Sequence, residues 1–409
     1  MRIVTSFEET QEILKSRAFG VEGSYNDTNA PLLRGSLIGL DGAAHRQRRR
    51  LLSRLFTRDR LAAYATDVVG PATDQQLSTQ DGPRADLVPM HATIFWDLAA
   101  QLIGLDLTEA ALERTGPLDV LVRTILRGIH VNYASAPTRT NAERAAVLDE
   151  AMTAMKGYEI ELLAPATERR REMVRALRAG EVASEDLPRD VITVLLRNWA
   201  PEWTEDLLAR ETVLFMIAGT ENSGSAVESC VYHLAGWLFE HPEDWPLTGN
   251  DEFLQRALYE TIRLHTSGRK IHPRVAVRDV TLASSGTRFG PGDRVGLHLA
   301  AANRDPRVYG PDADRFDPRR ADRLDRTVKP YGTGFAAGTH MCLGKDLVTG
   351  DLGASGRPGI LLEVLRRWYR AGLELNPDAP PVRSPEHEDR FASFPVIFTR
   401  LPARREDSR

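Results

Sequence analysis

Residues 331–344 carry the sequence YGTGFAAGTHMCLG, the stretch that decides the fold of this chain. The segment combines an aromatic start, several small residues and one cysteine, Cys342, followed by a glycine. Gly338 and Gly344 can supply tight turns on either side of Cys342, and a helix beginning just after the cysteine would favour its thiolate form. This pattern suits a soft anionic ligand held against a metal. The simpler alternative is a buried, inert cysteine in a glycine loop.

Three segments N-terminal to this stretch favour the first interpretation. Glu260 and Arg263 lie in YETIR, and Arg315 lies in ANRDPRVYGPDADRFDP at residues 302–318. Nearer the start of the chain, GAAHRQRRR contains His45 and Arg49. Taken alone, Glu260 and Arg263 are more typical of a weak surface pair three residues apart on a helix.

Together and in this order, the segments resemble the cytochrome P-450 family. The haem-binding signature of that family, Phe-Gly-x-Gly-x-His/Arg-x-Cys-x-Gly, is matched at Phe335, Gly338, His340, Cys342 and Gly344. Ala336 stands in place of its first glycine. The resemblance implies that the cofactor is haem b (iron protoporphyrin IX) and that Cys342 is its axial ligand, a thiolate that favours O–O cleavage.

The resemblance also implies roles for the charged residues of the other segments. Glu260 and Arg263 match the family's Glu-x-x-Arg, and Arg315 matches the third member of its buried ion triad. Cationic side chains must converge on the two haem propionates. Because HPRVA at 272–276 is similar to the family's Arg-x-Ala strand, the candidates for this contact are His45, Arg49, Arg274 and His340.

A long helix is predicted from Trp203 to Phe239, with an almost wholly apolar middle that indicates burial on most sides. Residues 218–223 of it, AGTENS, are similar to the family's Ala-Gly-x-Asp/Glu-Thr. Ala218 and Gly219 would leave space for O2, and Glu221 would supply the carboxylate for proton delivery. The family's threonine is replaced by Asn222, whose amide can donate and accept through separate atoms. Thr220 and Ser223 are weaker candidates for this role, and the alternative for Glu221 is a salt-bridged carboxylate on a buried helix.

The composition excludes several classes of protein. The chain has 409 residues, 42% of them hydrophobic and 27% charged, which is typical of a globular protein and not of a disordered or fibrous one. Its net charge of -4 is too balanced to indicate nucleic acid as a partner. Two cysteines give no disulfide framework, and no apolar run or signal pattern indicates a membrane span or export. We therefore expect a soluble, cytoplasmic protein.

The expected architecture is a single mainly helical domain over 1–409 with a small β part. Helix dominates residues 43–265 and 342–370, and strands are expected within 1–5, 274–300 and 390–401. The resemblance implies a triangular helical domain around haem, in which the family's first helix and first strand are absent or belong to an upstream extension. A kink is predicted at Pro165, and GDLGASGRPG at 350–359 is expected to interrupt the helix after Cys342.

Candidate substrate contacts follow from the same resemblance, although core packing is the alternative for each apolar one. They lie before His45, on the long helix, after Arg263 and near the C-terminus: Leu37, Ile38, Phe215, Met216, Ala218, Ser267, Gly268, Phe391 and Phe394.

Three functions remain open from the sequence. The first is a monooxygenase that inserts one atom of O2 into a small organic molecule, such as a secondary metabolite, with electrons from a ferredoxin and its reductase. In this function, the arginine-rich run from His45 to Arg60 would dock the acidic ferredoxin. The alternative is a solvated helix face for the arginines of this run: Arg46, Arg48, Arg50, Arg54, Arg58 and Arg60. The second is a haem-thiolate enzyme that uses peroxide or performs coupling, nitration or rearrangement, as Asn222 allows. The third is a non-catalytic haem sensor or carrier.

Overall fold

The computed structural model describes residues 1–21, 32–107, 118–131, 140–266, 271–385 and 390–402. Its described part is mainly helical with small sheets, as predicted. The chain forms two compact units. Unit 1 contains residues 1–19, 58–97 and 221–409, and unit 2 contains residues 20–57 and 98–220. The prediction of one single domain stays a prediction.

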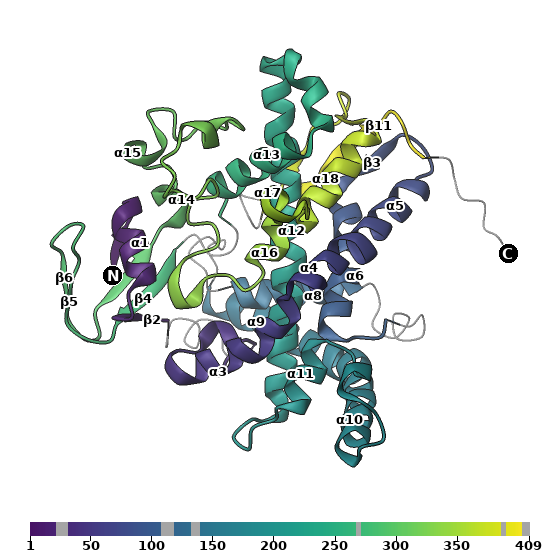
Figure 1. The fold of residues 1–409 in the computed structure, drawn as a ribbon, viewed down its shortest axis with the longest axis vertical. Coiled ribbons are helices and arrows are strands. Elements are labelled where there is room, and N and C mark those ends of the chain that lie inside the picture. The colour runs from purple at the N-terminus through teal and green to yellow at the C-terminus, as the bar shows by residue number, and fades with distance from the viewer. Residues whose placement is uncertain (22–31, 108–117, 132–139, 267–270, 386–389, 403–409) are drawn as a thin grey trace. The chain divides into compact units, whose positions relative to one another are not determined.

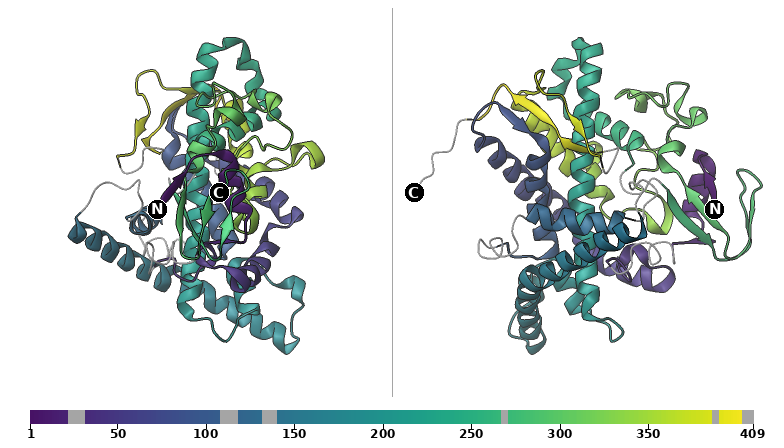
Figure 2. Two further views of the ribbon diagram at one scale, coloured as in Figure 1. Left: turned by 90° about the vertical axis from the view of Figure 1, so that its left-hand side faces the viewer. Right: turned by 180° about the vertical axis from the view of Figure 1, so that it is seen from behind.

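One long helix, α12 (Glu205–Glu240), supplies residues to both units and runs unbroken through Figures 1 and 2. Its 36 residues contain no proline, and its first turn carries Glu205 and Asp206, which favour a helix N-terminus. The prediction of a helix from Trp203 to Phe239 is therefore confirmed to within two residues at its start and one at its end. This helix carries residues 218–223, which belong to the candidate site.

Unit 2 is almost entirely helical. Basic α3 (Gly42–Leu52) continues into a 3₁₀ turn, η2 (Ser53–Phe56), and buries Leu51 and Leu52 as its apolar face predicts. Its other described helices, besides the residues of α12, are α8 (Leu118–His130), α9 (Asn141–Tyr158), α10 (Ala164–Ala179) and α11 (Val191–Arg197), and α6 (Leu87–Ile103) reaches it from unit 1. A π-helical turn, η4 (Glu159–Leu163), separates α9 from α10 just before Pro165, and the kink at this proline stays a prediction.

Unit 1 combines helices with four small sheets. Its described helices besides α12 and α6 are α1 (Phe7–Lys15), α4 (Arg58–Ala63), α5 (Gly70–Ser78), α13 (Asp251–Leu264), α14 (Leu299–Ala302), α15 (Pro306–Tyr309), α16 (Lys345–Thr349), α17 (Leu352–Ser355) and α18 (Ile360–Arg370). The interruption predicted at 350–359 is present. There α17 is flanked by Gly350 and Gly356, both at positive φ, and a bridge joins Asp351 to Arg357.

The largest sheet has the order β1-β7-β4-β2, with β1 (Arg2–Val4) parallel to β7 (Arg294–Leu297), and β4 (His272–Ala276) antiparallel to β7. Its fourth strand is β2 (Phe19–Gly20). A second sheet places β11 (Pro395–Phe398) between β3 (Arg84–Asp86) and β8 (Leu373–Leu375). Two hairpin-like pairs complete the set: β5 (Val280–Thr281) with β6 (Arg288–Phe289), and β9 (Val382–Arg383) with β10 (Phe391–Ser393). The strands β2, β3, β8 and β9 lie outside the predicted ranges, and each has only two or three residues.

Candidate functional site: the cysteine loop and the central helix

The loop before Cys342 is held in place by contacts within unit 1. The backbone N–H of Cys342 donates to the carbonyl of Phe335, at 2.9 Å, which closes the loop on itself. Gly338 has a φ of 69° and lies so close to α1 that a Cβ would come 2.3 Å from the Leu14 carbonyl oxygen. Only glycine fits this position. The loop thus packs directly against the backbone of α1, and this close approach requires glycine at position 338.

Cys342 differs from the other cysteine in exposure. Cys230 is fully buried, and burial raises the pKa of its thiol to about 12, whereas Cys342 is exposed. Of the two alternatives for Cys342, the structure therefore does not support a buried, inert thiol. The helix predicted to follow it is present as α16, which begins at Lys345 and has only five residues.

The residue that replaces the signature's first glycine has an unusual backbone. Ala336 has a φ of 55° and is the one non-glycine residue at positive φ among those described. This conformation costs an L-residue roughly 1–2 kcal/mol. The structure therefore preserves the glycine-like turn although the sequence departs from glycine.

Glu260 and Arg263 form a buried ion pair on α13. Arg263 donates through Nε and Nη2 to the two carboxylate oxygens of Glu260, at 2.7 and 2.6 Å, and both side chains are almost fully buried. Arg263 also donates to the carbonyls of Asn303 and Ala313, which anchors the irregular loop at 302–318. The surface-pair alternative is thus not what the structure shows.

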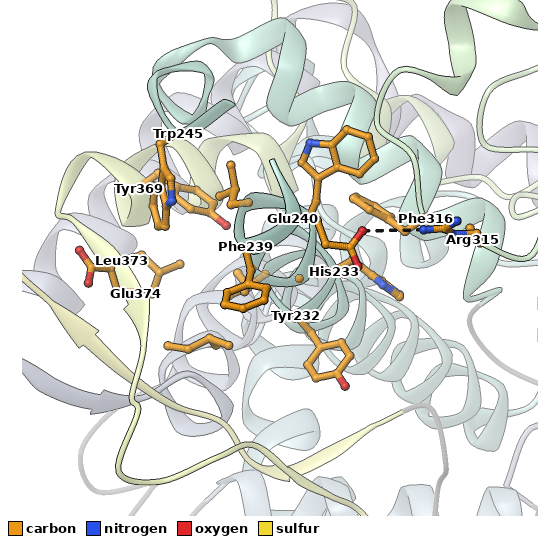
Figure 3. Close-up of a pocket in the computed structure, with 16 residues that line it drawn as sticks. Tyr232, His233, Phe239, Glu240, Trp245, Arg315, Phe316, Tyr369, Leu373 and Glu374 are labelled. Atoms are coloured by element: carbon orange, nitrogen blue, oxygen red, sulfur yellow. Dashed lines mark ion pairs between the residues drawn. The ribbon is translucent and has the colours of Figure 1, made fainter. Parts of the chain in front are cut away.

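The prediction that Arg315 is the third member of this cluster is wrong. Its side chain is 74% exposed and lies 3.7 Å from Glu240. Figure 3 shows this ion pair at a surface pocket lined by the end of α12. The third member is Arg320, 1% exposed, which donates through Nε to Glu260 at 2.8 Å. Arg320 also binds the carbonyl of Tyr309 and the side chain of Asp312. The sequence PRRADR at 318–323 held the signal, because it places further arginines just after the predicted segment.

The candidate haem contacts of unit 1 come from two elements. Arg274 is buried on β4, where it is paired with Val295 of β7, and its Nη1 donates to the carbonyl of Pro273. His340 ends a 3₁₀ turn, η8 (Gly338–His340), and is half-buried. Phe335 is buried, with its ring edge-on to Tyr331 at 5.1 Å. Gly344 directly precedes α16.

In the middle of α12, one stripe of side chains is open while the residues around it are buried. The residues along it are spaced by three or four positions and are exposed or half-buried: Leu214, Ile217, Ala218, Glu221, Asn222 and Ser225. Such spacing places side chains on one face of a helix. Gly219 is half-buried and adjoins this face, whereas Thr220 and Ser223 are buried on other sides, which weakens both as substitutes for Asn222. Thr220 instead donates to the Met216 carbonyl.

Glu221 is paired within unit 1. Its Oε2 accepts from Nη1 of Arg390 at 2.5 Å, and both side chains are about one-fifth exposed. The salt-bridged alternative for Glu221 is therefore present in the structure. It does not remove the carboxylate from the open stripe, and the contact engages Oε2 and not Oε1.

A second carboxylate on α12 pairs with a histidine of α6. His91 Nδ1 lies 2.8 Å from Oε1 of Glu228 and 3.1 Å from the carbonyl of Leu87. Burial lowers the pKa of His91, but Glu228 and Glu221 more than offset this, so the net shift is upward. Gly224 makes room for the ring, since a Cβ there would come 2.1 Å from its Nε2 atom. This pair is not among the predicted site residues, although His91 and Glu228 each interrupt an apolar helical run.

In unit 2, α3 carries the other two candidate haem contacts. His45 is 3% exposed and Arg49 is half-buried. Arg48, assigned to a solvated or docking face, is instead buried and lies 2.8 Å from Glu211 of α12. That assignment is wrong for Arg48, because a buried guanidinium with a buried carboxylate partner faces neither solvent nor a docking protein.

The structure sorts the candidate substrate contacts of unit 2. Leu37 is buried and Ile38 half-buried in a 3₁₀ turn, η1 (Leu37–Gly39). Phe215 is 8% exposed and stacks on Phe56, at 6.3 Å between ring centroids. Met216 is 1% exposed and, two positions from both Leu214 and Ala218, lies opposite the open stripe. Among the candidate substrate contacts, Leu214 and Ile217 of the open stripe therefore take the place of Met216.

Of the remaining candidates, Phe394 is fully buried and Phe391 is 6% exposed, with their rings edge-to-face at 4.6 Å. Both are core residues of unit 1 beside β11, which agrees with the packing alternative. Ser267 and Gly268 lie outside the described residues.

These residues fit a haem. Haem iron needs one axial ligand of the protein's own, and a cysteine thiolate is one of the established choices. Cys342 is exposed on a rigid loop of small residues, while α12 presents an open face with a carboxylate on it. Within the described ranges, no group of three His, Cys, Asp or Glu side chains could hold a metal ion, nor is any helix long and apolar enough to cross a membrane.

Comparisons with known proteins agree with this geometry. A family model described as Cytochrome P-450 matches residues 248–350. Nocardicin C N-oxygenase of Nocardia uniformis subsp. tsuyamanensis is 27% identical over 396 residues, covering 93% of this chain and 85% of the relative. Mycinamicin IV hydroxylase/epoxidase of Micromonospora griseorubida is 27% identical over 400 residues, with 93% and 88% covered.

Solved structures show the same fold. HmtT, involved in himastatin biosynthesis, gives a TM-score of 0.70 at 20% identity, over 97% of this chain and 91% of that one. LnmZ, a cytochrome P-450 hydroxylase of the leinamycin pathway of Streptomyces atroolivaceus, gives 0.61 at 21% identity, over 97% and 93%.

The fold is that of the solved structures compared above, and the two relatives are named an oxygenase and a hydroxylase/epoxidase. Over residues 248–350 this chain matches the cytochrome P-450 family, and an enzyme that incorporates oxygen into its substrate fits the relatives that match nearly its whole length.

Proposed function

We propose that the protein is a haem-thiolate monooxygenase in which Cys342 is the axial ligand of haem b. The observation that carries this proposal is the exposed Cys342 at the end of a loop fixed by Phe335 and Gly338. His45, Arg49, Arg274 and His340 would hold the propionates through charge-assisted hydrogen bonds.

When bound, haem with a thiolate ligand supplies the O2-activating chemistry, in which two electrons and two protons accompany each O2, one oxygen atom enters the substrate and the other leaves as water. The chain's part is to place small residues and proton donors. Ala218 and Gly219 have small side chains, which leaves space over the open face of α12. Glu221 offers Oε1 as a hydrogen-bond acceptor for proton delivery while Arg390 donates to its Oε2. Asn222, next to it, can order a water through its amide.

The electrons would come from a ferredoxin and its reductase. Arg46, Arg50 and Arg54 are exposed and four residues apart, so they share one face of α3 and the turn that follows it. A cationic face of this kind steers an acidic partner. The substrate class we propose is a small molecule of secondary metabolism, because the relatives named above act on nocardicin C and mycinamicin IV. With only two cysteines, the chain suits the reducing cytoplasm.

The test of the ligand assignment is the spectrum of the reduced protein with carbon monoxide. Wild type and Cys230→Ser should show the thiolate-specific Soret band, and Cys342→Ala should lose it. A thiolate band that survives in Cys342→Ala would overturn the assignment.

A second candidate function is oxidation with peroxide, or an atypical oxidation, and it is favoured by Asn222 and by the ion pair of Glu221 with Arg390. Under the monooxygenase proposal, Asn222→Ala and Glu221→Gln should keep haem and ligand binding but release more hydrogen peroxide per NAD(P)H consumed, because proton delivery is impaired. Product per electron that is unchanged in both variants, together with faster turnover on added peroxide, would favour the second candidate.

A further inference from the structure

A buried carboxylate of α12, Glu211, joins three elements of unit 2. Both of its oxygens lie 3.2 Å from the backbone nitrogen of Leu37, at the start of η1. Its Oε2 also accepts from Nη1 of Arg48 on α3, at 2.8 Å. Glu211 and Arg48 are 0% and 5% exposed in their side chains. One side chain therefore ties η1 and α3 to the central helix.

The arginine of this contact is itself held from a second side. The guanidinium of Arg48 lies over the ring of Trp203, 4.1 Å from its centroid, just before α12 begins. A cation over an aromatic face is stabilised when it is removed from water. Because Arg48 is fixed between Trp203 and Glu211, the carboxylate cannot swing away from Leu37 without leaving a buried charge unpaired.

Among the described residues, the segment that Glu211 holds has one other hydrogen bond from α12, in which Nη1 of Arg210 donates to the Arg34 carbonyl at 3.4 Å. Ser36 Oγ donates to the Leu33 carbonyl, and the N–H groups of Gly39 and Leu40 donate to the carbonyls of Ser36 and Leu37. These bonds are local, so they shape the turn without attaching it to a helix. Glu211 attaches the first residue of the turn, Leu37, to α12, and the half-buried Ile38 follows directly in the chain.

We propose that Glu211 is a positioning residue for substrate specificity: with Arg48 it clamps η1 against α12 and so sets how rigidly Leu37 and Ile38 bound the substrate space. This inference rests on the proposed function, since only a substrate-binding role of η1 gives the clamp a catalytic consequence. Glu211 acts through the backbone of Leu37 and need not touch the substrate.

Two charge-matched double variants separate the clamp from the ion pair. Arg48→Met with Glu211→Gln removes both charges but keeps an acceptor for the Leu37 N–H. Arg48→Met with Glu211→Leu removes the charges and the acceptor. Neither leaves a lone buried charge, which is the change that would endanger folding, and denaturant unfolding of both checks that global stability is comparable.

The first readout is hydrogen exchange at the Leu37 amide of the haem-loaded full chain. We expect about tenfold faster exchange in the Glu211→Leu double variant than in the Glu211→Gln double variant, corresponding to one lost hydrogen bond. Equal exchange in the two variants would overturn the clamp, whatever the enzyme's function.

The second readout is the binding of two nitrogenous haem ligands of different size, imidazole and 4-phenylimidazole, followed by the Soret shift. The ratio of their dissociation constants should change at least fivefold in the Glu211→Leu double variant and stay near the wild-type ratio in the Glu211→Gln double variant. A faster Leu37 exchange with an unchanged ratio would overturn the role in specificity. Wild-type protein that gives no Soret shift with imidazole would contradict the proposed haem function, while the exchange result would still decide the clamp.

Discussion

At the scale of single residues, Ala336 shows that the backbone can keep a conformation that its side chain disfavours. Its φ of 55° lies in the left-handed region, which glycine adopts without steric cost and alanine does not. The surrounding loop imposes this angle through the contact of Gly338 with α1 and the closure from Cys342 to Phe335. The strain is therefore local and removable.

We predict that Ala336→Gly stabilises the haem-loaded protein by about 1 kcal/mol, because the gain from relieving the left-handed angle exceeds the entropy that glycine adds to the unfolded chain. Urea unfolding followed by the Soret band measures it. Ala337→Gly is the matched control, since the φ of Ala337 is -152°, and it should be neutral or destabilising. Equal effects of the two substitutions would contradict the assignment of strain to Ala336.

Glu211 makes the stability of the protein depend on pH. Burial raises its pKa to about 7 from an ordinary value of 4.5, although Arg48 and the Leu37 N–H lower it. Between these two values the folded state holds the proton that the unfolded state has lost, so the free energy of unfolding falls as pH rises through this window and is level above it. The fall is of order 3 kcal/mol.

We therefore predict that Glu211→Gln removes this part of the pH dependence. Urea unfolding of both proteins at pH 5, 6, 7 and 8 should show the wild type losing stability relative to the variant up to about pH 7 and no further. Other titrating groups, His91 among them, contribute equally to both proteins and cancel. A constant difference from pH 5 to 8 would show that Glu211 is ionised throughout.

At the scale of elements, the ion cluster on α13 attaches a long irregular segment to a helix. Residues 310–319 have little regular structure, yet Arg263 donates to the carbonyl of Ala313 and Arg320 to that of Asp312. Both arginines are paired with the same buried carboxylate, Glu260. Carbonyl groups of an irregular segment need such donors, because no strand or helix supplies them. The cluster thus supplies the hydrogen bonds that a helix or strand would otherwise make to these carbonyls.

We predict that Arg320→Ala destabilises the protein by about 3–5 kcal/mol, since it leaves part of a buried ionic cluster uncompensated, and that it lowers haem content as well. Arg315→Ala should change stability by less than about 0.5 kcal/mol, because the pair with Glu240 is exposed. Thermal unfolding and the ratio of haem to protein test both. A large loss in Arg315→Ala with little in Arg320→Ala would reverse our correction of the triad.

At the scale of the whole molecule, a net charge of -4 coexists with a basic run at one helix. Arg46, Arg50 and Arg54 are exposed, whereas Arg48 is taken up by the clamp with Glu211. The docking face available to an acidic ferredoxin is therefore smaller than the run of arginines indicates.

We predict that changing Arg46, Arg50 and Arg54 together to glutamine slows reduction by a ferredoxin at low ionic strength by about tenfold or more and makes the rate less sensitive to salt, as expected for lost electrostatic steering. Changing Arg171 and Arg175 of α10 to glutamine is the control, because these exposed residues carry ion pairs with Glu205 and Glu168. Stopped-flow reduction at several salt concentrations measures both. Equal slowing in the two variants would contradict docking at α3.

Several features of this protein follow from local sequence alone. The cysteine loop, the long helix α12, the pair Glu260–Arg263 and the interruption at 350–359 depend on neighbouring residues, on helical spacing or on glycine and proline, and such effects act over a few positions of the chain. The resemblance to the cytochrome P-450 family rested on the same local motifs.

Only the tertiary structure decided which charges meet across long separations. Arg320 and not Arg315 reaches Glu260, Arg48 turns inward to Glu211, and Arg390 and His91 approach the carboxylates of α12. The sequence cannot rank these partners, because a charge on a helix has several possible counterparts. Which of them is buried beside it depends on how the chain packs, and burial is what turns a weak surface pair into one that is costly to break.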